Sequence, residues 1–285
     1  MLLSQFRKAN IQLPKTQFDR SVHLEYLGTA GFVFSSSSRT LVVDPFVSRP
    51  SLLETACFPL KSDAQLLQSI IPKADDVLVG HAHHDHILDA PQLCKHTGAR
   101  FIGSEDSCRI ARAAGVSEEQ ILETSGREKI SCGDSCIVEG LPSLHGRVYF
   151  NRVTLPGKVA ADFQWPARFW HFRHGQVLNW HIDINGLKIV HIDSAEFIEE
   201  ELQGKTADIL CLCAIGRRWR PNYVRDAVRL VQPKLVIACH WDWFFTPYEG
   251  PHYLLPDVDI NGFVNEIEEA GCEAAVLPIG AQLSL

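Results

Sequence analysis

One short stretch limits what this chain can be more than any other feature of its sequence. Residues 77–90 read VLVGHAHHDHILDA, in which an apolar run leads at once into four histidines and one aspartate within six positions. The run DVLVG, residues 76–80, is almost wholly apolar, which is typical of a strand buried on both faces. Loops that follow such strands are where layered α/β proteins place ligands and metal ions. The stretch therefore predicts a binding site at a strand end.

The spacing His-x-His-x-Asp-His favours metal binding. Side chains alternate along extended backbone, so His81 and His83 can face one ion. Asp85 and His86 can reach a second ion once the chain bends. Imidazole and carboxylate ligands suit zinc, iron or manganese. Without a metal, several imidazoles packed at a strand end need other partners or become mutually repelling cations. The alternative is a solvated loop that is merely rich in histidine.

Apolar runs and helical periodicities alternate along the rest of the chain and predict a layered α/β protein. Asn185-Gly186 is a strong hairpin signal, and Ser104 and Ser117 have the pattern of helix N-caps. Predicted strands cover residues 22–28, 30–34, 40–46, 76–80, 99–103, 129–146 as a pair, 177–193 as a hairpin, 207–213, 234–240 and 273–280. Predicted helices cover residues 63–70, 87–98, 104–115, 221–233 and 260–271, with a shorter one after Ser117.

The length of 285 residues fits one α/β domain or two small lobes. We expect a single domain over residues 1–285, which begins with a polar lead-in at residues 1–20. Residues 147–176 are irregular in pattern and rich in aromatic residues and arginine, which indicates an insertion.

Charge, cysteine content and hydropathy argue against several classes of protein. The net charge of −7 disfavours a large nucleic-acid footprint, which needs a basic face. The nine cysteines include no C-x-x-C pair and lie mostly in apolar runs, as expected for reduced thiols in a reducing compartment. No apolar run reaches the length of a signal peptide or a transmembrane helix. We therefore expect a cytoplasmic protein without an integral membrane segment.

Four motifs, in this order, make the chain resemble the metallo-β-lactamase superfamily of metal-dependent hydrolases. HAHHDH follows a strand, LPSLHG follows a strand and a short loop, and GLKIVHIDSA and PKLVIACHWDWF contain later strand ends. The opening YLGTAGFVF and LVVDPF is similar to the branch that contains ascorbate-phosphate lactonases and N-acyl-phosphatidylethanolamine phospholipases. The resemblance runs from Val22 to the C-terminus. It implies an α/β fold of the four-layer αββα type, two β-sheets flanked by helices.

Carried over position by position, the resemblance implies two divalent cations, with zinc first and manganese or iron as alternatives. One cation takes His81, His83 and His145, the other takes Asp85, His86 and His240, and Asp193 bridges them. The alternatives are a surface-loop position for His145, a strand-end cap for Asp193 and a core histidine against aromatic rings for His240. The sequence departs from the family pattern beside Asp193, where Ile192 and Ser194 replace the usual Gly and Thr.

Three further residues are candidates for supporting this cluster. Asp44, in VVDPF, is a candidate acceptor for the N–H of a ligand imidazole. Asp89 is a second candidate of the same kind, with a position on a helix surface as its alternative. His191 lies two residues before Asp193 on a predicted strand and should face the same side. The alternative for His191 is a packed core histidine.

The resemblance implies a hydrolase in which two cations lower the pKa of a shared water from about 16 to about 7. Asp85 would bind metal and orient the hydroxide. The bond cleaved would be a phosphodiester, a lactone or a related ester or amide. One alternative is a mononuclear-iron oxidoreductase of the persulfide-dioxygenase type on the same scaffold. Others are an RNA-processing nuclease, which the acidic balance disfavours, and a non-enzymatic metal-holding protein.

Two segments bear on the substrate, which we expect to be an anionic or amphipathic small molecule rather than a nucleic acid. Residues 163–180, FQWPARFWHFRHGQVLNW, would form an aromatic and cationic wall or else pack as a small core of their own. Arg217 and Arg218 precede a predicted helix start, a place that can receive an anion, although a solvated face is the alternative. The oligomeric state is left open, with an oligomer as one of the options.

Overall fold

The computed structural model describes residues 7–285, so residues 1–6 of the predicted lead-in lie outside the described residues. The rest of the lead-in runs beside the C-terminal part of the chain. Gln12 forms an antiparallel bridge with Val276, and the Thr16 N–H donates to the Glu273 carboxylate at 2.9 Å. Residues 7–20 thus contact the edge of the fold as extended chain.

The strands of residues 7–285 form two mixed sheets, and the first contains the strand before the histidine motif. Its members are β1 (His23–Gly28), β2 (Gly31–Ser35), β3 (Thr40–Val43), β4 (Asp76–Leu78), β5 (Arg100–Gly103), β6 (Ile121–Glu123) and β14 (Gln282–Ser284). They lie in the order β14-β1-β2-β3-β4-β5-β6. Strand β4 pairs parallel with both β3 and β5, which agrees with its burial at every residue.

The second sheet carries the later strands. Its members are β7 (Lys129–Ser131), β8 (Cys136–Ser143), β9 (Val177–Ile184), β10 (Leu187–Ile192), β11 (Ile209–Cys213), β12 (Leu235–Cys239) and β13 (Glu273–Ala275). They lie in the order β13-β12-β11-β10-β9-β8-β7. Strands β10 to β13 pair parallel, so β10, β11 and β12 end at the same edge of the sheet.

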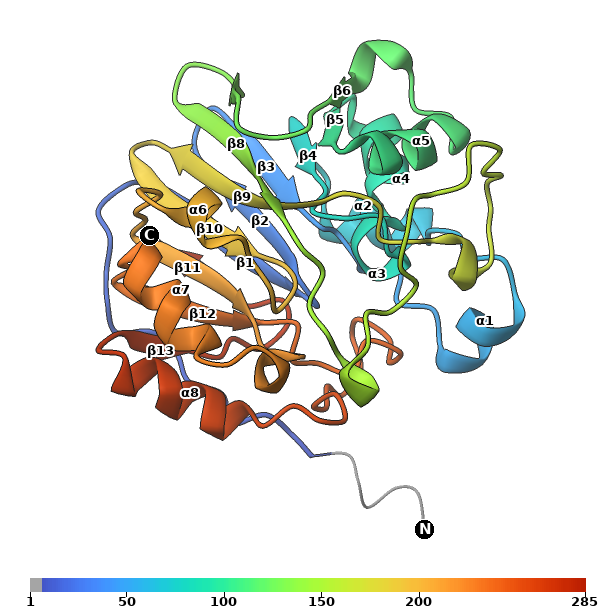
Figure 1. Cartoon of the computed structure of the whole chain (residues 1–285). Helices are drawn as coiled ribbons and strands as arrows, with labels where there is room; N and C mark the ends of the chain where they lie inside the picture. The colour runs from blue at the N-terminus through green and yellow to red at the C-terminus, as the bar shows by residue number, and fades with distance from the viewer. Residues whose placement is uncertain (1–6) are drawn as a thin grey trace.

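Helices form the two outer layers (Figure 1). Beside the first sheet lie α2 (Ala64–Ile70), α4 (Ala90–Thr97) and α5 (Glu105–Ala113), and beside the second lie α6 (Glu199–Leu202), α7 (Tyr223–Val231) and α8 (Ile260–Glu269). Short helices are α1 (Leu52–Cys57), α3 (His84–Ile87), η2 (Glu118–Gln120), η3 (Tyr149–Asn151), η4 (Phe169–His171) and η5 (Arg217–Trp219). The predicted α/β sandwich is confirmed. Among residues 7–285, no helix has both the length and the apolar character needed to cross a bilayer.

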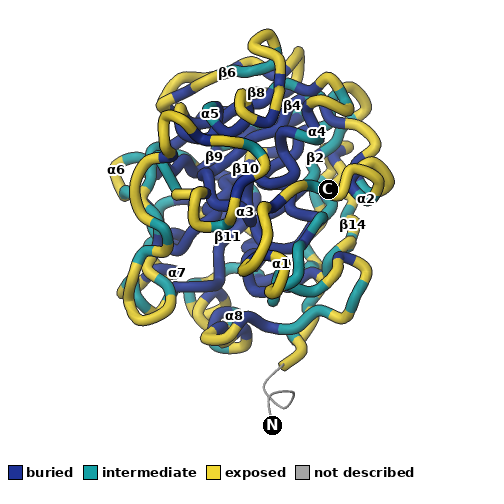
Figure 2. Tube along the Cα trace, turned by 90° about the vertical axis from the view of Figure 1, so that its right-hand side faces the viewer, coloured by how far each residue is buried: buried dark blue, intermediate teal, exposed yellow. Residues whose placement is uncertain are grey.

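Alternation along the strands divides the core in two. Leu41 and Val43 of β3 join the core between the sheets, while Val42 between them joins the core under α2, α4 and α5. Strands β11 and β12 are buried at every residue, because one face meets the other sheet and helices cover the second. Figure 2 shows β9, β10, β11 and α3 in the buried interior, with exposed residues gathered on outer loops and helix faces.

Several local signals act as predicted. Asn185 and Gly186 have φ values of +51° and +74°, so the turn between β9 and β10 has the left-handed backbone that Asn-Gly favours. The Ser104 hydroxyl accepts from the backbone N–H of Ser107 and caps α5. Gly98 ends α4 with φ +78°.

Other local predictions are wrong. The helix expected after Ser117 is a single 3₁₀ turn, η2, and the Ser117 side chain makes no capping hydrogen bond. Pro221 precedes α7 instead of occupying its first turn, because Asn222 is the N-cap. The final predicted strand, residues 273–280, ends at Ala275, and the chain then forms β14 against β1.

Candidate metal centre

The histidine motif lies directly beyond β4, and every residue from 79 to 90 is buried. Helix α3 begins after His83. Two backbone hydrogen bonds tie the motif to the chain entering β9. The Leu178 N–H donates to the Gly80 carbonyl at 2.8 Å, and the Ala82 N–H donates to the His174 carbonyl at 3.0 Å. The motif is therefore clamped between the sheets and is not a solvated loop.

Side chains that follow β4, β8, β10 and β12 converge on one place. Among residues 7–285, three groups have candidate ligand atoms that all lie within 4.8 Å of one another. The groups are His81, His83 and His145; His81, His86 and Asp193; and Asp85, His86 and His240. Each residue with a predicted ligand role belongs to at least one of them.

The first group is made of three imidazoles. The Nε2 of His81 lies 3.0 Å from the Nδ1 of His83, and the His145 ring lies 4.9 Å and 4.7 Å from those two rings. The Nδ1–H of His145 donates to the carbonyl of Gly146 at 2.7 Å. This hydrogen bond fixes the tautomer of His145 and leaves its Nε2 lone pair for the group.

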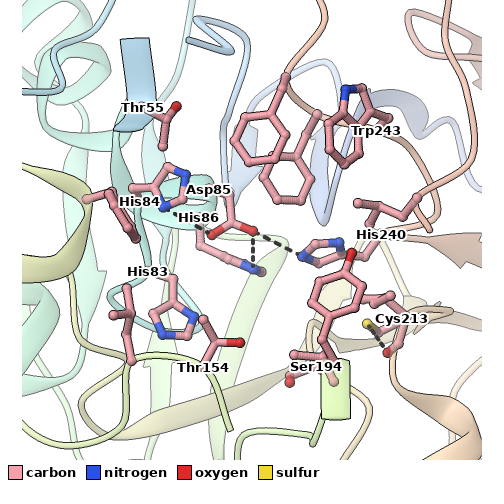
Figure 3. Close-up of a pocket in the computed structure, with 18 of the residues that line it drawn as sticks. Thr55, His83, His84, Asp85, His86, Thr154, Ser194, Cys213, His240 and Trp243 are labelled. Atoms are coloured by element: carbon pink, nitrogen blue, oxygen red, sulfur yellow. Dashed lines mark hydrogen bonds and ion pairs between the residues drawn. The ribbon is translucent and has the colours of Figure 1, made fainter. Parts of the chain in front are cut away.

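The second group is built around a carboxylate. Asp85 Oδ2 lies 3.2 Å from Nε2 of His240 and 3.8 Å from Nε2 of His86. Figure 3 marks both contacts with dashed lines. The other ring nitrogen of His86, Nδ1, donates to Asp44 Oδ2 at 2.9 Å. Asp44 follows β3, and its second oxygen accepts from the Gly80 N–H at 2.7 Å. Asp44 therefore orients His86 and the start of the motif together.

Asp193 lies between the two groups. Its Oδ2 is 2.6 Å from Nδ1 of His81 and 3.8 Å from Nδ1 of His86, and its Oδ1 is buried. The neighbouring Ile192 is fully buried and, by alternation along the strand, points to the face opposite Asp193. Ser194 accepts from the Gly146 N–H at 2.8 Å, which links the Asp193 strand end to the His145 loop. Neither departure from the family pattern displaces Asp193 from the cluster.

The electrostatics favour cation binding. Burial, reinforced by neighbouring imidazoles, lowers the pKa of His83 and of His86 well below the usual range and that of His145 to about 3. Burial alone would raise the pKa of Asp85, but nearby histidines, His86 first, hold it well below its usual range. Three of these imidazoles are thus neutral at pH 7 and Asp85 is ionised, which are the protonation states that bind metals.

Buried polar atoms without a hydrogen-bond partner also favour cation binding at the cluster. Within residues 7–285, His83 Nε2, Asp193 Oδ1 and His240 Nδ1 are buried without a hydrogen-bond partner. Buried polar atoms of this kind need an explanation such as an ion or water. A set of imidazoles and carboxylates suits zinc, manganese or iron, so the residues present fit a divalent cation.

We expect the metal-free protein to lose stability as the pH falls below about 6.5. The unfolded chain binds protons at its histidines near that pH, whereas the lowered pKa of His83, His86 and His145 keeps the folded imidazoles neutral. Each such histidine removes about 1.4 kcal/mol per pH unit from the free energy of unfolding. Urea denaturation in the presence of chelator at pH 8, 7, 6 and 5 measures the free energy of unfolding at each pH. His145→Gln should make the free energy of unfolding depend less on pH. His96→Gln, an exposed control, should leave that dependence unchanged. A flat wild-type profile contradicts this prediction.

Gly80 has a specific steric role. A Cβ at this position would lie 2.1 Å from Asp193 Oδ2 and 3.2 Å from Asp44 Oδ2. Gly80→Ala must therefore displace the Asp193 carboxylate. A misplacement near 1 Å in such a site can lower kcat/KM by about 100-fold. The matched control is Gly140→Ala, whose Cβ meets nothing closer than 3.4 Å. Equal activity of the two variants would remove the argument for a fixed Asp193.

Two of the three candidates for supporting the cluster, Asp89 and His191, contact other parts of the protein instead. Asp89 is buried and is neither on a helix surface nor against a ligand imidazole. Its carboxylate accepts from the backbone N–H groups of Val47 and Ser48, at 2.7 Å and 2.8 Å, and so holds the loop after β3. His191 is a packed core histidine, with Nε2 2.8 Å from the Ala30 carbonyl and its ring edge-on to Phe32.

The predicted anion site at Arg217 and Arg218 is wrong. Arg217 forms ion pairs with Asp259 and Glu266, at 3.3 Å and 3.1 Å, and Arg218 pairs with Asp257 at 2.6 Å. Neither arginine lines the cleft that contains the histidine cluster. Acidic residues on and before α8 neutralise both.

In the aromatic-rich segment, residues 147–176, some side chains pack together and others line the cleft, although the described residues of the cleft lining include no arginine from the cationic wall predicted for residues 163–180. Phe172 is fully buried, with the rings of Phe163 and Trp165 at 5.4 Å and 6.1 Å, so part of the segment is a small core. Tyr149 and Phe169 instead line the cleft.

Two histidines of the site were not singled out from the sequence. His84 lines the cleft, with its ring 5.8 Å from Phe46. His174 stacks on His145 at 5.5 Å, with its Nδ1–H donating to the Gly175 carbonyl at 2.5 Å. His84 stands inside the motif, and this position was a usable signal. His174 carries no pattern of its own, because only the long segment before β9 brings it to His145.

The chain is similar in sequence and in fold to known proteins. The family described as Beta-lactamase superfamily domain matches residues 23–240. A UPF0173 metal-dependent hydrolase of Methanopyrus kandleri is 27% identical, over 90% of this chain and 96% of its own length. Another, from Anaeromyxobacter dehalogenans, is 33% identical over 81% of this chain and 78% of its own. A solved metallo hydrolase from Ignicoccus hospitalis superposes with a TM-score of 0.62 at 18% identity, covering 93% of this chain and 98% of that one.

Proposed function

The chain belongs to the metallo-β-lactamase superfamily and is a metal-dependent hydrolase, and on that premise we propose that it cleaves its substrate at a dinuclear metal centre. In this proposal His81, His83 and His145 would hold one divalent cation, Asp85, His86 and His240 would hold the other, and Asp193 would serve both. The substrate is a small molecule with a phosphodiester, lactone or related ester or amide bond. Zinc is the first candidate metal, with manganese and iron as alternatives.

The observation that carries the proposal is the convergence of the three ligand groups in one buried place. Two of these groups correspond to the two proposed cations, and the third contains Asp193 beside His81 and His86. Divalent cations held in this way lower the pKa of water to about 7 and polarise a carbonyl or phosphoryl oxygen.

The residues around the cluster have separate tasks. Asp85 is ionised and lies within 3.8 Å of both His86 and His240, so it can accept a hydrogen bond from the attacking water and orient it. The Asp44 carboxylate holds His86, and the Gly146 carbonyl holds His145. Such outer hydrogen bonds set the tautomer of a ligand imidazole and raise its basicity.

A hydrolysis panel tests the proposal. Metal-stripped protein is reloaded with zinc, manganese or iron and assayed on bis-p-nitrophenyl phosphate, several lactones, a thioester and a β-lactam. We expect metal-dependent turnover of at least one ester, lactone or phosphodiester and none of the β-lactam. The variant His81→Ala plus His240→Ala, treated in the same way, should be inactive. Absence of turnover for every metal and substrate, or oxygen uptake with thiol substrates instead, would contradict a hydrolase.

A further inference from the structure

The cleft above the histidine cluster differs from the rest of the protein surface in its chemistry. It has a volume of about 460 Å³, within the range of small-molecule sites. His81, His83, Asp85, His86 and His240 are among the residues that line it. Apart from this cluster, its walls consist mainly of aliphatic and aromatic side chains from α1, η3, η4 and residues 243–256, with a few hydroxyl groups.

The aromatic wall begins at the cluster itself. The Phe244 ring lies 5.7 Å from that of His240 and 4.6 Å from that of Phe245, which lies 4.9 Å from Trp243. Figure 3 shows Trp243 and Thr55 across the cleft from Ser194 and Thr154. If the reacting bond of a ligand lies at Asp85, the part of the ligand next to that bond therefore contacts apolar side chains.

Cations are missing from this lining. Among the described residues that line the cleft, none is lysine or arginine. Arg168 and Arg173, which the sequence offered as a cationic wall, donate instead to the backbone carbonyls of Cys57 and Pro156, at 2.8 Å and 2.6 Å. A charged group of the substrate placed beyond the cluster would lose its hydration without gaining an ionic partner, which is costly.

We propose that the cleft binds an uncharged, apolar acyl or aryl group, so that the preferred substrate is a neutral ester, lactone or amide with a hydrophobic chain. This inference rests on the proposed hydrolase function and narrows its substrate class. Of the predicted anionic or amphipathic substrate, this inference retains the amphipathic character. The anionic part is replaced by a neutral chain, because the described residues that line the cleft include no lysine or arginine to pair with an anion.

The test is a chain-length series. On zinc-loaded protein, kcat/KM for p-nitrophenyl esters from acetate to octanoate should rise about threefold to fourfold per methylene until the cleft is filled, as expected for burial of one CH₂ group. The p-nitrophenyl monoester of adipate, of similar length but ending in a carboxylate, should be at least about tenfold poorer than the hexanoate.

Two adjacent leucines provide a matched pair of variants. Leu52 lines the cleft and is 54% exposed, whereas Leu53 is 70% exposed and does not line it. Leu52→Asp should reduce the gain per methylene, and Leu53→Asp should leave it unchanged. A flat series, a preference for the adipate monoester, or equal behaviour of the two variants overturns the inference.

Binding without hydrolysis separates this inference from the proposed function. Methyl ketones from 2-butanone to 2-decanone resemble the esters but cannot be hydrolysed, and calorimetry measures their dissociation constants. Tighter binding with each methylene supports the apolar cleft even if no ester is turned over, in which case the proposed function alone fails. Ester turnover combined with ketone binding that ignores chain length overturns the inference and leaves the hydrolase intact.

Discussion

Asp85→Asn is expected to lower kcat by about 1,000-fold, because it removes the ionised oxygen that lies between His86 and His240. The amide has the same shape as the carboxylate but carries no charge and is a weak metal ligand. The proposed second cation should be held less tightly as well. Parallel measurement of kcat and of bound metal in one preparation separates the loss of the cation from the loss of water orientation.

The control for this substitution is Asp134→Asn, which changes an exposed aspartate in the turn between β7 and β8. It should leave kcat and metal content at the wild-type level. If Asp85→Asn kept its rate and both metal equivalents, Asp85 would have neither of the roles assigned to it.

Arg49→Met is expected to lower the free energy of unfolding by about 3–5 kcal/mol, as is usual when one partner of a buried ion pair is removed. Arg49 forms an ion pair with Asp242, and both side chains are fully buried. Asp242 also accepts from the Thr29 N–H at 2.7 Å, and the Thr29 carbonyl accepts from the His240 N–H at 2.5 Å. The pair therefore supports the backbone that carries His240.

Two comparisons make this second prediction specific. Arg49→Met combined with Asp242→Asn should be less destabilising than Arg49→Met alone, because it leaves no isolated charge in the core. Arg112→Met, which breaks an exposed pair with Glu118, should change the free energy of unfolding by at most about 1 kcal/mol. Urea denaturation of all three variants gives the comparison. A value for Arg49→Met no larger than for Arg112→Met would contradict a structural role for the pair.

The parts of the fold that follow from local rules were predictable. Alternating and apolar runs locate most strands, and the Asn185-Gly186 turn fixes the register of β9 and β10. The predicted ligand residues all follow strand ends, of β4 in one sheet and of β8, β10 and β12 in the other. Their convergence therefore needed only the order of elements and the family resemblance.

The parts that depend on distant partners were not predictable. Arg217 and Arg218 looked free in sequence, and the acidic residues that neutralise them lie around the start of α8. Asp89 looked like a ligand support, yet its partners are the backbone N–H groups of a loop after β3. Arg49 and Asp242 are separated by 193 positions, and neither has a local pattern. A side chain's charge is visible in a sequence, but its partner across the core is not.

The prediction of a cationic wall failed for a related reason. Residues 163–180 contain both aromatic rings and arginines, and composition alone cannot separate those that face the cleft from those that do not. In the structure Phe169 lines the cleft, whereas the guanidinium groups of Arg168 and Arg173 bind backbone carbonyls. Only the folded segment shows which part of its chemistry meets a ligand.

Metal stoichiometry tests the central claim most directly. Protein stripped with chelator, reloaded with zinc at neutral pH and freed of excess metal is analysed by mass spectrometry of its metal content. The proposed site predicts about two zinc ions per wild-type chain, about one for His240→Ala, and essentially none for His81→Ala plus His240→Ala. A wild-type chain without near-stoichiometric metal, or a double variant that still binds two ions, would contradict a centre built from these side chains.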